Sequence, residues 1–165
     1  MKNFFTLTFS LLLISQLGFS QQQHNPETLS FKKIAKEKST KLHEEYPKVA
    51  DASFKSVNTA AERHKLVDQA WHDLWHSFTK YYHDKGLHFK KKRRLYVHLH
   101  FSETGHLDYF GYHFKGRENK KTQRFVELFK EYIKDHNFAV AEGVKFSQCG
   151  EIHLLPRDKG IKEGL

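Results

Sequence analysis

The sequence predicts an α+β domain in which a three-stranded antiparallel sheet, built from a β-hairpin, a helix and a further strand, packs against helices. Two observations predict this class. Apolar residues recur every three or four positions before residue 86 and again between residues 122 and 133, which is typical of helices that bury one face. Between residues 95 and 114 apolar residues alternate with polar ones, which is typical of strands with one buried face.

The first twenty residues predict a secretory signal peptide. Met1–Asn3 is positively charged, an apolar run follows up to Leu17, and the small residues Gly18 and Ser20 precede a cleavage position before Gln21. The apolar run is short for a membrane span, although an uncleaved membrane anchor is the alternative. We therefore expect an exported chain, periplasmic or extracellular after cleavage near Ser20/Gln21, with no transmembrane span in its mature form.

The composition limits the classes of partner. The chain left after cleavage is long enough for one domain with a modest core. Its net charge is +8, because the +9 of the full chain loses only Lys2 with the leader. A basic exported protein is attracted to anionic lipid and acidic glycan, whereas no nucleic acid is expected as a partner outside the cytoplasm. Cys149 is the only cysteine, so no intramolecular disulfide can form.

The predicted domain spans residues 29–156 and begins with a helical part, residues 29–86. The polar residues 21–28 before it predict a flexible lead-in, and a first helix over 29–46 ends before Pro47. The second helix lies within 59–86. Its start fits a capping box, in which Thr59 and Glu62 each bond to the backbone amide of the other, and Gly86 is a natural stop.

The predicted sheet follows this helical part. Four apolar residues mark the buried face of its first strand: Leu95, Val97, Leu99 and Phe101. After a turn at 102–105, residues 107–114 form the antiparallel partner, with a bulge near Asp108-Tyr109 where the apolar parity changes. Thr122 is the predicted cap of a third helix that extends to about Ile133. A last strand within 144–155 completes the sheet, and residues 157–165 form a tail.

Residues 95–154 carry a pattern around one glycine. Apolar residues flank Gly105 at regular offsets, with Val97, Leu99 and Phe101 before it and Leu107, Phe110 and Tyr112 after it. The helix at 125–133 and the pair Asn137-Phe138 follow in order. In this pattern the segment resembles the C-terminal domain of TonB, the Gram-negative energy transducer. The resemblance implies a protein-binding module that acts through a sheet edge and is not an enzyme.

The sequence also departs from the TonB pattern. The proline usually found after the aromatic pair is missing, and Gly150 interrupts the last strand. A retained membrane anchor and a proline-rich spacer are both missing, so energy transduction is not implied. The resemblance says nothing about residues 29–86.

Two histidine pairs are candidate metal ligands. His72 and His76 lie four residues apart on one face of the second helix, as in zinc proteases, but Asp73 replaces the usual glutamate. His98 and His100 lie two apart on one face of a strand, which we expect to be exposed to solvent unless a second helix covers it. Imidazole suits zinc or copper, so a histidine-based metal-binding protein is one alternative function.

The competing interpretation of both pairs is a polar surface in a histidine-rich chain. A tight structural zinc site needs four protein ligands, and neither pair has a third and fourth in sequence, although folding could bring His64, Asp68 or His113 close. No cofactor and no stoichiometric metal are therefore expected.

The densest charge run is a candidate anion site. It consists of five adjacent cations: Lys90, Lys91, Lys92, Arg93 and Arg94. Lysines and arginines of the 115–121 loop would strengthen it if the ends of the hairpin bring them near. The alternatives are a solvated loop and a basic surface module that binds anionic lipid or polysaccharide.

Cys149 is not a convincing nucleophile. Catalysis needs a histidine beside the thiolate and a group that stabilises an oxyanion, and only His153 is near in sequence. A buried small residue and an intermolecular disulfide are the other interpretations. We expect no enzyme, but an exported binding or protein-interaction domain of the cell envelope, with an envelope protein as its partner.

Overall fold

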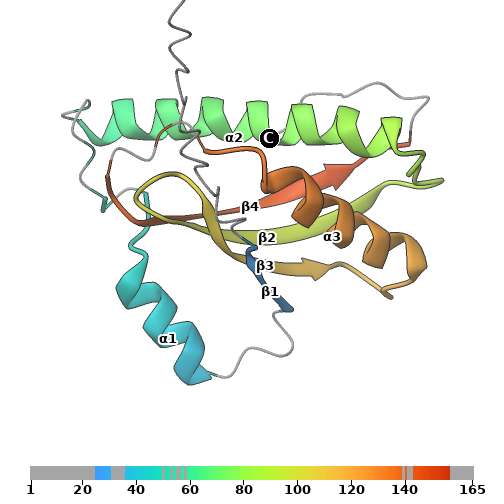
Figure 1. The fold of residues 1–165 in the computed structure, drawn as a ribbon, viewed down its shortest axis with the longest axis horizontal. Helices are drawn as coiled ribbons and strands as arrows, with labels where there is room; N and C mark the ends of the chain where they lie inside the picture. Colours follow the sequence, from blue (N-terminus) through green and yellow to red (C-terminus); the bar gives the residue numbers. More distant parts are fainter. Residues whose placement is uncertain are drawn as a thin grey trace, which may run out of the picture.

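The computed structural model describes residues 25–30, 36–49, 51, 52, 54, 57, 59–138, 140 and 143–156. The predicted leader and the tail at 157–165 lie outside these residues. Seven elements follow in order: β1 (Glu27–Ser30), α1 (Lys36–Glu45), α2 (Ala60–Asp84), β2 (Arg93–Phe101), β3 (Leu107–Phe114), α3 (Lys120–Ile133) and β4 (Phe146–Leu154). Figure 1 shows three helices arranged around one sheet, which confirms the α+β class.

The sheet has four strands in the order β1-β3-β2-β4. The three predicted strands form its antiparallel part, with β2 paired to β3 on one side and to β4 on the other. The prediction of a purely antiparallel, three-stranded sheet was wrong in one respect, since β1 pairs with β3 in parallel. Glu27–Ser30 had been assigned to the lead-in and the first helix. The free edge of β3 offers unpaired backbone groups to this short segment, and such pairing overrides a weak helix pattern.

The predicted bulge is present. His100 pairs with Tyr109, but the next residue, Phe101, pairs with Leu107, so Asp108 is the extra residue of β3 at the bulge. The extra residue changes the parity of β3. Both Leu107 and Phe110 are therefore buried, although they lie three positions apart on one strand.

The main core lies between the sheet and the pair α2 and α3. The alternating apolar residues of β2 (Leu95, Val97, Leu99 and Phe101) face these helices and are at most 2% exposed. The capping box of α2 is confirmed, since Thr59 Oγ1 accepts a hydrogen bond from the backbone of Glu62 and the Glu62 carboxylate accepts one from the Thr59 backbone. The helix ends before Gly86, whose positive φ of 77° suits glycine.

The third helix begins earlier than predicted. Its N-cap is Asn119, and Thr122 is the third helical residue. Asn119 Oδ1 accepts hydrogen bonds from the backbone of Lys121 and Thr122, while Thr122 Oγ1 accepts one from the Asn119 backbone. Threonine and asparagine are both good caps. The position of the loop after β3 determines which of the two residues is the cap. The apolar stripe carries no information on that loop, so the start of the helix was predicted three residues too late.

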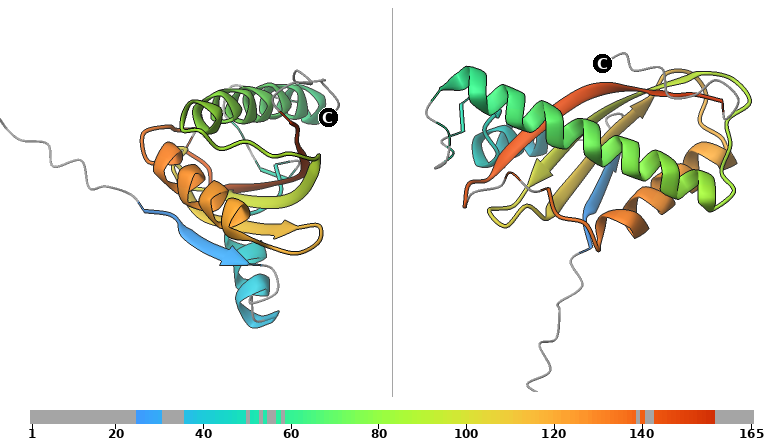
Figure 2. Two further views of the ribbon diagram at one scale, coloured as in Figure 1. Left: turned by 90° about the vertical axis from the view of Figure 1, so that its right-hand side faces the viewer. Right: turned by 90° about the horizontal axis from the view of Figure 1, so that it is seen from above.

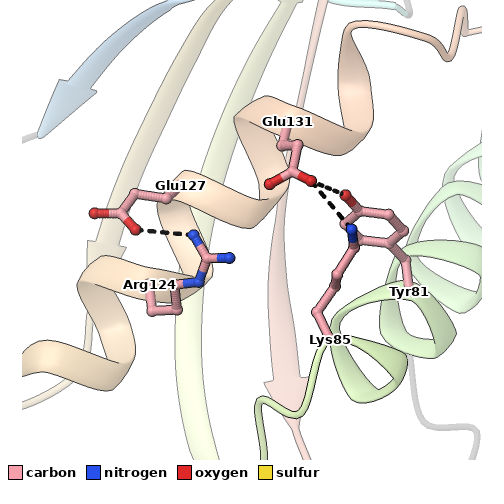
Figure 3. A network of polar contacts seen from close by, with 5 residues as sticks. All are labelled: Tyr81, Lys85, Arg124, Glu127 and Glu131. Atoms are coloured by element: carbon pink, nitrogen blue, oxygen red, sulfur yellow. Dashed lines mark hydrogen bonds and ion pairs between the residues drawn. The ribbon is translucent and has the colours of Figure 1, made fainter.

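Polar contacts join the C-terminal part of α2 to α3 around the aromatic core. Figure 3 shows Tyr81 and Lys85 both directed at Glu131 of α3. The Tyr81 hydroxyl donates to the Glu131 carboxylate at 2.6 Å, and the Lys85 ammonium lies 3.4 Å from it. These two donors lower the pKa of Glu131. Beneath them, the ring of Phe78 packs against the rings of Phe125 and Phe129.

The other face of the sheet is not left to solvent. Figure 2 shows α1 on the opposite side of the sheet from α2. The helix occupies only Lys36–Glu45 of the predicted 29–46, and it ends before Pro47 as expected. Tyr46 follows it, packs edge-on against His100 and donates a hydrogen bond to Asp108 at 2.7 Å. The helices therefore cover both faces of the sheet.

Candidate functional site

The open edge of the sheet at β4 is the first candidate site. Residues 47–49 cover its first part, where the Ser147 backbone donates to Pro47 O at 2.8 Å and accepts from the Val49 backbone at 3.2 Å. The backbone groups of Ser147 therefore point away from β2. Because these directions repeat every two residues along a strand, the backbone groups of Cys149, Glu151 and His153 point outward as well.

No backbone group among the described residues pairs with these three. Within the described part of the chain, the segment 149–153 thus presents a row of free donors and acceptors, which is the template that an added strand needs. The cross-strand partners on the inner side, Tyr96 and His98 among them, belong to β2. The edge is held rigidly, because β4 pairs with β2 along its whole length.

A groove of about 740 Å³ runs beside this edge, and we call it the β4 groove. The N-terminal half of α2 forms one wall, and residues 148–150 of β4 form the other. Trp71 of α2 packs directly over Gly150, where a Cβ atom would lie 3.0 Å from the indole. A side chain at 150 would displace the tryptophan, so the glycine allows α2 to approach the strand closely.

The α2 wall of the β4 groove is polar and mostly basic. His64, Lys65, Asp68 and His72 line it above the apolar surface of Trp71. Three of these can carry positive charge and one carries negative charge. The sequence pattern indicates His64, Asp68 and His72 only as potential metal ligands, and Gly150 only as an irregularity of the last strand. A glycine inside a strand is itself a sign that another element approaches closely. Here the close approach of α2 to Gly150 forms the floor of the β4 groove.

The basic run at 90–94 is divided between two faces. Lys90, Lys91 and Arg93 line a recess of about 270 Å³ together with Asn119 and Lys121 from the start of α3. Side chains on β2 alternate, so Arg94 falls on the other face, 3.6 Å from Glu151 of β4. Lys92 is exposed outside the recess. The structure therefore brings three of the five predicted residues together, and adds Lys121 from the 115–121 loop.

Neither histidine pair gains a third metal ligand within the described residues. The rings of His72 and His76 lie parallel with their centres 6.4 Å apart on α2. His98 and His100 lie with their centres 4.3 Å apart. In the described part of the chain, no group of three or more histidine, cysteine, aspartate or glutamate side chains is placed to hold a metal ion. His113 pairs with Tyr96 on the neighbouring strand, not with either histidine of β2.

Of the two arrangements expected for the face of His98 and His100, exposure to solvent was wrong and cover by a helix is observed. His100 is 3% exposed and His98 is half-buried, because α1 and Tyr46 cover this face. Burial, with His43 and Lys48 nearby, lowers the pKa of His98 to about 4. Burial, with His98 and His43 beside it, lowers the pKa of His100 to about 3. Both rings are neutral at ordinary pH.

Cys149 is exposed, which contradicts its interpretation as a buried small residue. It lies directly opposite His98 on β2. His153, the histidine nearest to it in sequence, is instead hydrogen-bonded to Glu151 at 2.7 Å. The thiol therefore lacks the histidine partner that the sequence offered for catalysis, and it lies on the open edge of β4.

Comparisons with known proteins suggest no function, so an assignment depends on the geometry described above. No model of a known protein family matches the chain, and neither do the curated proteins or the solved structures. Of the helices in the described residues, none has the length and apolarity to cross a bilayer.

Proposed function

We propose that this chain is an exported, non-enzymatic binding domain of the cell envelope that takes an extended segment of a partner protein as an added strand on β4. The observation that carries the proposal is the juxtaposition of a free strand edge with a groove. The backbone groups of 149, 151 and 153 point outward, and the β4 groove lies alongside them. In strand addition, the edge supplies backbone hydrogen bonds and a neighbouring groove selects alternate side chains.

The chemistry of the β4 groove indicates what the added segment would carry. The free edge spans five residues, so a segment of about that length pairs with it. Every second side chain of the segment would enter the groove. There it would meet Trp71, which favours an apolar contact, and the basic side chains of His64 and Lys65, which favour a carboxylate.

Two features of the sequence support the same assignment. The predicted signal peptide directs the chain to the envelope. The resemblance of residues 95–154 to the TonB C-terminal domain implies a module that binds protein at a sheet edge, and the strand that ends this segment is β4. The assignment to a TonB-like family is part of the proposal.

The test uses a proline that removes one outward N–H group. Cys149→Pro deletes a donor that β2 does not use, and edge strands accept proline at such positions. Cys149→Ser is the matched control, since it also removes the thiol but keeps the N–H group. Extended peptides selected from a random library against the full mature chain, in reducing buffer, supply the probes.

We expect selected peptides to slow hydrogen exchange of the amides at 149, 151 and 153. The proline variant should bind these peptides at least about tenfold more weakly. This loss corresponds to about one hydrogen bond between uncharged groups, together with the steric clash between the proline ring and the added strand. The serine variant should bind normally, and both variants should show cooperative unfolding. Undiminished binding by the proline variant, or failure to select any peptide that protects these amides, would refute the proposal.

A further inference from the structure

A second surface, distant in sequence from the open edge, also has the form of a binding site. We call it the basic recess, and it is defined by Lys90, Lys91, Arg93, Asn119 and Lys121 around the buried ring of Phe89. It lies where the chain enters β2 and where α3 begins. Nothing in strand addition at β4 uses it.

Hydrogen bonds hold the two segments of the basic recess together. Lys121 Nζ donates to the backbone oxygen of His88 at 2.8 Å, and Arg93 Nη2 donates to that of Arg117 at 2.8 Å. The Lys115 backbone donates to Arg94 O at 2.9 Å. These contacts join residues 88–94 to 115–121. The cations are therefore gathered on a fixed frame and are not spread along a loose loop.

The charges of the basic recess are not balanced within the described residues. Lys90, Lys91 and Lys121 form no ion pair with a described carboxylate. Glu118 is the acidic residue of the adjoining loop, and it lies near Tyr112. Grouped like charges repel each other and raise the free energy of the folded state, so an anion bound among them is stabilised.

The start of α3 adds further positive charge beside the basic recess. Lys120 and Lys121 lie in its first turn, which contains no acidic residue. The N-terminal end of a helix carries a partial positive charge and favours acidic residues, so lysines there destabilise the helix slightly. The first amides of α3 are already bonded to Asn119 Oδ1. Side-chain cations, and not free helix amides, therefore form the recess.

We infer that the basic recess binds a phosphate group, carried either by a small phosphate ester or by a lipid headgroup. Its volume of about 270 Å³ lies just below the range for small-molecule sites, roughly 300–1,000 Å³, so the group bound is compact. Two lysine ammonium groups and the guanidinium of Arg93 supply charge-assisted hydrogen bonds. Asn119 adds its side-chain amide nitrogen, because its oxygen is occupied by the helix.

The test compares two variants of equal charge. Lys90→Gln with Lys91→Gln removes two cations that make no structural contact in the described residues. Lys80→Gln with Lys134→Gln removes two cations elsewhere on α2 and at the end of α3. Binding of inorganic phosphate and of glycerol phosphate is measured by calorimetry at constant ionic strength. Binding to phosphatidylglycerol vesicles is measured by co-sedimentation, with phosphatidylcholine vesicles as the neutral comparison.

Specific loss of binding in the first variant, by about tenfold, with little change in the second, supports the inference. If only the soluble phosphates show this pattern, the source is a small ester. If only the anionic vesicles show it, the source is a lipid headgroup. Absence of binding to both kinds of probe, or equal loss in both variants, overturns the inference, since equal loss would reflect net charge alone. Peptide binding at β4 should be the same in all variants, so the two proposals fail independently.

Discussion

Single residues on the α1 face of the sheet make the stability of the protein depend on pH. His100 is buried, and neither of its ring nitrogens has a hydrogen-bond partner of normal geometry. The backbone of Tyr109 raises its pKa only slightly against the effect of burial. His43 of α1 and Lys48 add positive charge around the neighbouring His98. Protonation of either buried ring is therefore unfavourable in the folded state.

The sign of the pH effect follows from these pKa values. An unfolded histidine takes up a proton near pH 6.5, whereas folded His98 and His100 resist until about pH 4 and 3. Between these limits the unfolded state binds more protons, so the free energy of unfolding falls as pH falls. It is constant with respect to these two groups above about pH 7. Each buried histidine contributes a slope of about 1.4 kcal/mol per pH unit.

We predict that His100→Phe lowers the pH dependence of the free energy of unfolding by the contribution of about one buried histidine. It should also stabilise the protein near pH 5, because it replaces an unpaired polar ring by an apolar one. Urea unfolding measured from pH 7 to pH 4 checks this. His76→Gln, an exposed change on α2, is the control and should leave the slope close to wild type. A wild-type slope that persists in His100→Phe would show that this residue is not the titrating group.

At the scale of elements, helix ends depend on groups that an apolar stripe does not reveal. Both long helices begin with a capping box, but only that of α2 was placed at the correct residue from the sequence. For α3, Asn119 and Thr122 exchange side-chain and backbone hydrogen bonds. Thr122 is 1% exposed, so its hydroxyl depends on this pairing.

We expect Asn119→Ala to lower the free energy of unfolding by about 1 kcal/mol, the usual effect of removing a helix cap. The backbone amides of Lys121 and Thr122 would lose their acceptor. Chemical denaturation at neutral pH measures the change, and Gln123→Ala, exposed in the same turn, is the control. Equal stability of Asn119→Ala and wild type would contradict the assignment of the cap.

Elements that pair across long sequence distances are the other feature at this scale. β1 joins β3 across about eighty residues of chain, and Lys48 bridges to Ser147 on β4. Both use edges of the sheet that the hairpin pattern leaves open. The second contact determines where the free edge of β4 begins, and so which residues are available for an added strand.

At the scale of the whole molecule, the two proposed sites lie on different parts of one frame. The β4 groove lies between α2 and the edge of the sheet, whereas the basic recess lies between the entrance to β2 and the start of α3. Both rely on the packing of α2 and α3 against the sheet. The proposed location outside the cytoplasm depends instead on the predicted leader.

The predicted leader can be tested on its own. When the full-length chain is produced in a Gram-negative host, mass spectrometry of the protein from the envelope or periplasmic fraction should find a start at or near Gln21. Replacing part of the apolar run with charged residues should keep the precursor in the cytosol. An intact Met1 on wild-type protein in the cytosolic fraction would refute export.

The sequence alone determined the local structure. The period of the apolar residues placed α2, the hairpin of β2 and β3, the stripe of α3 and the bulge at Asp108, because burial of one face is encoded at the spacing of each element. It also located the basic run and the glycine in the last strand. For Cys149 and the histidines, the sequence specified the residue type but not whether the side chain is buried or exposed.

Tertiary structure alone decided the rest. A weak local preference at 27–30 yielded to pairing with β3, and α1 covered the face on which His98 and His100 lie. The starts of β2 and α3 lie side by side. This arrangement divides the basic run between two faces and brings part of it next to Lys121. The edge of β4 is open because strand order places it outermost and, of the described residues, 47–49 cover its beginning. Such contacts join residues far apart in the chain, and no local pattern encodes which distant surface will cover a given face.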